Sequence, residues 1–113
     1  MTENEFIKKC LKPELDSRNL WWSIKEAKSV RGLPDIWGCY NGKFFAMEVK
    51  KDAAEASKNT GRIALQKYTL RQIDLKGGGL GYIVHPGNLQ EILDSLDYEC
   101  SRRPYQTLPP LPL

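Results

Sequence analysis

Two carboxylates and a lysine are placed to share one face of a β-hairpin. Asn41-Gly42 lies between two apolar runs, and this pair favours the positive φ angles of a type I′ turn. Counting outward from the turn puts Asp35 opposite Glu48, with Cβ atoms roughly 4.5–5.5 Å apart. Side chains alternate along a strand, so Lys50 points to the same face as Glu48. Opposed like charges weaken a sheet, which indicates a neutralising cation, and hard oxygen ligands suit Mg²⁺.

These residues resemble the PD-(D/E)XK nuclease superfamily, and a longer stretch looks like its small virus-type VRR-NUC branch. The superfamily pattern is Pro34-Asp35 followed by Glu48-Val49-Lys50. The branch-like stretch adds the segments 31–39 and 42–50 and then Leu65-Gln66. The resemblance covers roughly residues 3 to 97.

The resemblance implies a set of site residues. Asp35 and Glu48 would hold Mg²⁺, with Mn²⁺ able to substitute, and Lys50 would position or activate the attacking water. The backbone carbonyl of Val49 would be a further ligand, and Glu3 on the first helix an additional one. From the residues alone, an ordinary ion pair between Glu48 and Lys50 and a turn-forming role for Asp35 remain alternatives.

A glutamine is expected to join this site from a helix. Ile63, Gln66, Leu70 and Ile73 form one helical stripe, so the Gln66 amide should face the sheet. Buried amides need hydrogen-bond partners. A satisfied structural glutamine explains this as well as a functional one, and the resemblance assigns Gln66 to the catalytic set.

Basic residues on the segments around the acids would bind DNA phosphates. Solvated polar loops are the alternative for any such group. The predicted phosphate-binding residues are Arg31, Lys51, Lys58, Arg62 and Lys67.

Hydrophobic periodicity supplies the elements that must position these residues. A helix crossing between the last two strands makes that pair parallel. The prediction is an α/β fold, a restriction-endonuclease-like mixed β-sheet flanked by helices, in the order α-β-β-β-α-β-α. The expected elements are a helix over 3–17 interrupted at Pro13, strands 20–24, 33–40 and 43–50, a polar loop 51–61, a helix over 62–76 that ends at three glycines, a strand 80–84 and a helix over 89–96.

Length and composition limit the function classes. The chain has 113 residues and a net charge of +3, which fits one domain and permits DNA binding without requiring it. We assign residues 1–97 to the nuclease-like domain and 98–113 to a proline-rich tail. The three cysteines and one histidine match no zinc spacing.

The sequence therefore predicts a Mg²⁺-dependent DNA endonuclease, selective for branched or junction DNA by the resemblance. The alternative is a nucleic-acid-binding module on a nuclease fold without cleavage activity. Analogy with the family suggests a homodimer. The absence of a membrane-span or signal pattern predicts a cytoplasmic protein with no membrane partner, in a bacterial host if it is phage-encoded.

Overall fold

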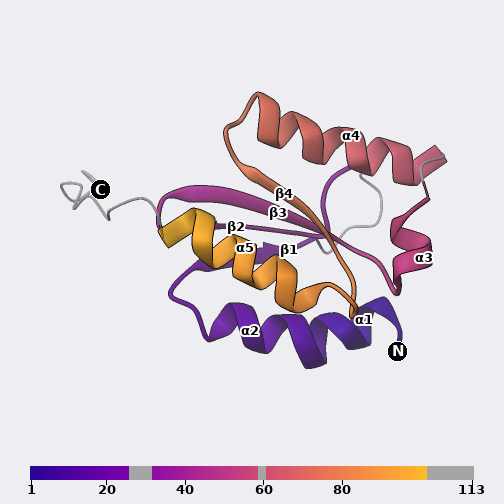
Figure 1. Cartoon of the computed structure of the whole chain (residues 1–113), viewed down its shortest axis with the longest axis horizontal. Helices are drawn as coiled ribbons and strands as arrows, with labels where there is room; N and C mark the ends of the chain where they lie inside the picture. The colour runs from indigo at the N-terminus through magenta and orange to yellow at the C-terminus, as the bar shows by residue number, and fades with distance from the viewer. Residues whose placement is uncertain (26–31, 59–60, 102–113) are drawn as a thin grey trace.

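The computed structural model describes residues 1–25, 32–58 and 61–101. They form a four-stranded mixed sheet flanked by helices (Figure 1), which confirms the predicted α/β class. The strand order is β1-β2-β3-β4, with β3 and β4 parallel as predicted and the other pairs antiparallel. The elements are α1 (Glu3–Phe6), the π-helix η1 (Ile7–Leu11), α2 (Lys12–Asp16), β1 (Trp21–Ile24), β2 (Ile36–Tyr40), β3 (Lys43–Val49), α3 (Ala53–Ala56), α4 (Gly61–Leu75), β4 (Leu80–Val84) and α5 (Leu89–Ser101).

The β2–β3 hairpin has the predicted register. Asn41 (φ 50°) and Gly42 (φ 79°) have the positive φ angles of the expected turn, and Ile36 pairs with Met47. β2 begins at Ile36, three residues later than predicted, so Asp35 stands at a bend just before the strand. The proline that precedes Asp35 has no N–H group, and it therefore cannot extend the hydrogen-bonded ladder.

The interruption predicted at Pro13 takes the form of a π-helical turn. The backbone N–H of Lys12 donates to the carbonyl of Ile7, five residues earlier. A proline ring clashes with the carbonyl four residues before it in a regular helix. The wider π turn relieves that clash and lets the chain continue into α2 without a break.

Residues 51–61, predicted to be a loop, contain the short helix α3. Asp52 caps this helix by accepting a hydrogen bond from the backbone N–H of Glu55 at 2.8 Å. An aspartate followed three residues later by glutamate is typical of a helix start. The loop prediction was therefore wrong here, because it did not use this signal in the sequence.

α4 packs closely on β3 and β4. A Cβ atom at Gly81 would lie 2.8 Å from the carbonyl oxygen of Leu70, so only glycine permits this approach. The helix ends as predicted at the glycine run, where Gly78 has φ 66° and the N–H of Gly79 donates to the Ile73 carbonyl at 3.1 Å.

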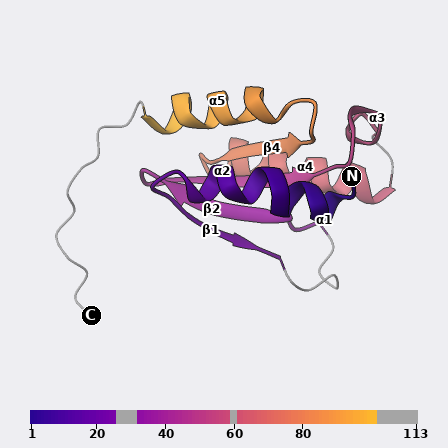
Figure 2. The same cartoon turned by 90° about the horizontal axis from the view of Figure 1, so that it is seen from below.

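The main hydrophobic core lies on the other face of the sheet, beneath α1–α2 and α5 (Figure 2). α5 continues to Ser101 instead of ending at Leu96, because Cys100 extends its buried stripe. Residues 98–101, predicted to begin the tail, therefore belong to α5, and the remaining tail residues 102–113 lie outside the described ranges. No helix within the described ranges is long and apolar enough to cross a membrane.

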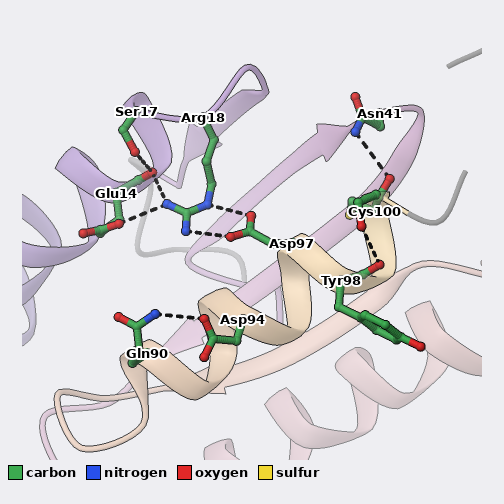
Figure 3. Close-up of polar contacts among 10 residues, drawn as sticks. Glu14, Ser17, Arg18, Asn41, Gln90, Asp94, Asp97, Tyr98 and Cys100 are labelled. Atoms are coloured by element: carbon green, nitrogen blue, oxygen red, sulfur yellow. Dashed lines mark hydrogen bonds and ion pairs between the residues drawn. The ribbon is translucent and has the colours of Figure 1, made fainter. Parts of the chain in front are cut away.

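Arg18 joins the N-terminal helices to α5 (Figure 3). Its Nε and Nη2 donate to the two carboxylate oxygens of Asp97 at 2.8 and 2.9 Å, and its Nη1 donates to the Glu14 carboxylate at 3.0 Å. The Asn41 amide donates to the carbonyl of Cys100 at 3.4 Å, which links the hairpin turn to the end of α5. These contacts hold the helices of the core layer together, and none of them involves a residue of the predicted site.

Candidate functional site

An open cleft of about 1190 Å³ lies at one end of the sheet, where β1 and β3 end and the chain enters β2. The starts of α1 and α4 and the short helix α3 converge at this end (Figure 1). The cleft therefore gathers residues from distant parts of the sequence. Its polar and charged lining includes Glu3, Lys25, Asp35, Lys51, Arg62 and Gln66.

Asp35 and Glu48 stand opposite each other where the cleft meets the sheet. The Ile36–Met47 pair is the last in the β2–β3 ladder, and the next step of the same register joins Asp35 to Glu48. Asp35 Oδ2 accepts a hydrogen bond from the backbone N–H of Val49 at 2.9 Å. This bond fixes the Asp35 carboxylate beside the end of β3.

Glu48 is a buried carboxylate with incomplete hydrogen bonding. It is 2% exposed, and its Oε2 has no hydrogen-bond partner in the described part of the chain. The Nζ of Lys50 lies 3.8 Å from the other oxygen, Oε1, which is a long contact for an ion pair. Burial, and secondarily the Asp35 carboxylate, raise the pKa of Glu48 to about 8. A buried acceptor without a hydrogen-bond partner lowers the stability of the folded protein. A cation bound at Oε2 would offset that cost, so Oε2 is the position in the site that favours a cation most.

Gln66 orients Lys50. The Nζ of Lys50 donates to Gln66 Oε1 at 2.7 Å, and the two residues are 4% and 3% exposed. The predicted helical stripe therefore does turn the Gln66 amide toward the sheet. The hydrogen bond bears out the first explanation, a satisfied glutamine, and it holds the lysine near Glu48. The catalytic assignment of Gln66 stays a prediction.

The carboxylate pair fits a hard divalent cation. Mg²⁺ in proteins takes one or two carboxylates and keeps its remaining positions for water and phosphate. In an extended strand the N–H and C=O groups of a residue point the same way. The Val49 carbonyl is therefore directed to the side of Asp35, as its N–H group is. Asp35, Glu48 and the Val49 carbonyl could together supply three oxygen ligands.

Glu3 does not complete a three-carboxylate cluster. Within residues 1–25, 32–58 and 61–101, no group of three or more His, Cys, Asp or Glu side chains could hold a metal ion. Glu3 nevertheless lines the cleft, and burial followed by the charge of Glu55 raises its pKa, with Asp35 contributing in the same direction. Glu55, on α3, is a neighbour of the site that the sequence analysis missed. The capping pattern that begins α3 is the signal that could have located it.

The predicted phosphate-binding residues divide into three groups. Lys51 and Arg62 line the cleft, as does Lys25. Lys58 and Lys67 do not line it. The Nζ of Lys67 instead donates to the backbone carbonyl of Lys58 and ties α4 to the segment after α3. The third group is Arg31, which lies outside the described residues.

Comparisons with protein-family models, with curated proteins and with solved structures find no match to this chain.

Proposed function

We propose that this chain is a Mg²⁺-dependent endonuclease that hydrolyses phosphodiester bonds in DNA, with Mn²⁺ able to replace Mg²⁺. One observation carries the proposal. The buried Oε2 of Glu48 has no hydrogen-bond partner in the described chain, and the Glu48 carboxyl lies behind Asp35, which lines the cleft together with basic side chains. A buried acid pair of this kind supports metal binding better than a structural ion-pair cluster, in which each oxygen would be satisfied.

Each site residue has a distinct role in the proposed reaction. Asp35, Glu48 and the Val49 carbonyl would hold the ion. When bound, Mg²⁺ polarises a phosphoryl oxygen and makes water in the site more acidic. Lys50, held in place by Gln66, donates a hydrogen bond toward the reacting phosphate and stabilises the charge that develops there.

Lys25, Lys51 and Arg62 would bind the phosphates that flank the reacting one. Such contacts favour DNA of a given shape over a given sequence, which agrees with the proposed preference for branched or junction DNA. The finer fold assignment, a restriction-endonuclease-like sheet, and the homodimer belong to the same proposal.

Cleavage of defined DNA substrates tests the proposal directly. Purified protein is incubated with single-stranded, duplex, flap and four-way junction DNA in Mg²⁺, Mn²⁺ or EDTA. Glu48→Gln removes a proposed ligand, and Glu91→Gln, an exposed glutamate in the first turn of α5, is the matched control. We expect metal-dependent cleavage by wild type and Glu91→Gln, and none by Glu48→Gln.

Two results would count against the nuclease. Equal cleavage by folded Glu48→Gln protein and wild type would move the active site elsewhere. DNA binding without cleavage in either metal, for every substrate, would favour the binding-module alternative.

A further inference from the structure

The two faces of the sheet are covered to different extents. α1–α2 and α5 enclose the main core on one face, and Trp22 of β1 packs against this core. On the other face α4 packs against β3 and β4. In Figure 2, α4 lies on the β4 side of the sheet and away from β1. The described elements leave the β1–β2 half of that second face largely uncovered, because Trp21 and Cys39 on it are exposed.

Aromatic rings lie on this uncovered half and at its border on β3, where the Phe44 side chain approaches Gly79. Trp21 pairs with Cys39 in the β1–β2 ladder, and Cys39 pairs with Phe44 in the β2–β3 ladder, so their side chains share one face. Trp37 lies two residues before Cys39 and points to the same side. Trp21 is 61% exposed, Phe44 is 39% exposed and Trp37 is half-buried. We call Trp21, Trp37 and Phe44 the aromatic face.

The aromatic face leads directly to the cleft. Asp35 precedes Trp37 by two positions and is on the same side of the sheet, and two residues of a strand span roughly 7 Å. Lys25 and Arg62 line the cleft beyond Asp35. A path along this face therefore begins on flat, uncharged rings and ends among cations at the carboxylate pair.

We propose that the aromatic face stacks the bases of a single-stranded DNA segment that leads into the cleft, an inference that rests on the proposed nuclease function. Rings that bind successive bases beside a basic groove that binds phosphates are the physical basis of single-strand recognition. In a duplex the bases are stacked on one another and present no free face to a ring. Charge complementarity favours nucleic acid over a second copy of the chain, because the cations at the end of the path match phosphates. The substrate therefore carries an unpaired strand next to the bond that is cleaved.

Binding in EDTA tests the inference without cleavage. Fluorescence anisotropy measures the affinity for an oligothymidine of about 12 nucleotides and for a duplex of the same length. Trp21→Leu keeps an apolar side chain and removes the ring, whereas Trp21→Tyr keeps a ring. Tyr98→Ala is the matched control, because Tyr98 is 59% exposed on α5.

We expect Trp21→Leu to weaken oligothymidine binding by about 5- to 150-fold, the range that corresponds to the loss of one base–aromatic stack. Trp21→Tyr should retain most of the affinity, and Tyr98→Ala should match wild type. Duplex affinity should not change in any variant.

Three results for Trp21→Leu would overturn the inference. The first is an oligothymidine affinity equal to that of wild type, and the second is an equal loss of affinity for oligothymidine and duplex. The third is a change from dimer to monomer in sedimentation while the oligothymidine affinity stays intact. The last result would assign the aromatic face to a second copy of the chain. Single-strand binding by a wild-type protein that cleaves nothing in Mg²⁺ would refute the nuclease while leaving the aromatic face supported, so the two failures are distinguishable.

Discussion

Glu48→Gln should remove a pH-dependent loss of stability from the metal-free protein. The folded-state pKa of Glu48 is about 8 against an ordinary value of 4.5, because the carboxyl is buried beside Asp35. Between these two pH values the folded protein holds a proton that the unfolded chain has released. The free energy of unfolding therefore falls as pH rises through this window. The stabilisation is fully present below pH 4.5 and is lost above pH 8.

The size of the effect follows from the two pKa values. The full difference corresponds to about 5 kcal/mol, at about 1.4 kcal/mol for each pH unit. Between pH 5.5 and pH 8.5 the wild type should lose about 3 kcal/mol from this one group. For a domain of this length that loss is about 10 °C in Tm. A glutamine at position 48 stays neutral throughout, so its protein should lack this component.

Urea denaturation in EDTA at pH 5.5 and pH 8.5 provides the measurement. Other titrating groups are common to both proteins, so the difference between wild type and Glu48→Gln isolates the buried carboxyl. From pH 5.5 to pH 8.5, the free energy of unfolding of Glu48→Gln should increase by about 3 kcal/mol relative to that of wild type. Glu91→Gln should show the same pH dependence as wild type. Parallel pH profiles for wild type and Glu48→Gln would show that Glu48 is ionised in the folded protein at pH 7, and the argument from burial would be wrong.

Added Mg²⁺ should raise the Tm of wild type, and the rise should be larger at pH 8.5 than at pH 5.5 because carboxylate ligands must be deprotonated. Asp35→Asn should abolish the rise. Equal rises in wild type and Asp35→Asn would show that the metal binds away from Asp35. Lys50→Ala should reduce the single-turnover cleavage rate by about 10²–10³-fold with little change in DNA affinity, and a loss confined to affinity would contradict its role at the reacting phosphate. Gln66→Ala should reduce the same rate to a smaller extent, since it releases the lysine without removing it; an unchanged rate would show that the 2.7 Å contact is structural only. Arg18→Ala should cost about 1–3 kcal/mol of stability at pH 7. The Arg18 hydrogen bonds lower the pKa of Asp97 in the folded protein, so this contribution is present above the ordinary pKa of aspartate and disappears as pH falls through the lower pKa of folded Asp97. Equal urea midpoints for Arg18→Ala and wild type at pH 7 would contradict the prediction.

The parts of the site that follow from local rules could be predicted from sequence. The Asn41-Gly42 turn fixes the hairpin register through its own φ preferences, and that register places Asp35 against Glu48. The Gln66 orientation follows from helical periodicity in the same way. In each case a short stretch of chain determines the geometry.

The parts that were missed depend on contacts between distant segments. Lys67 is turned away from the cleft by its hydrogen bond to the Lys58 carbonyl, which no spacing rule reveals. Trp21 and Trp22 are adjacent and point to opposite faces, as alternation predicts, and Trp21 is exposed whereas Trp22 packs against the core. Alternation alone does not reveal which of the two faces the helices cover. Glu55 is a different case: a four-residue helix leaves too little periodicity to detect, and the local capping pattern from Asp52 to Glu55 was the one signal of it in the sequence.

The π-helical turn at Ile7–Leu11 has a consequence for how this protein could be re-engineered. A π turn holds one residue more than the α-helical turn it replaces, and each residue of an α-helix rotates the chain by about 100°. Deleting one residue from this segment, together with Pro13→Ala so that the proline clash does not return, would let the helix close into a regular α-helix while α2 stayed anchored by Arg18. Everything before the deletion would turn by about that angle and shift along the helix axis, and Glu3 would leave the cleft wall. One deletion after Ile7 and one substitution at Pro13, both far from the carboxylate pair in sequence, would thus reshape the mouth of the cleft without altering any residue in it.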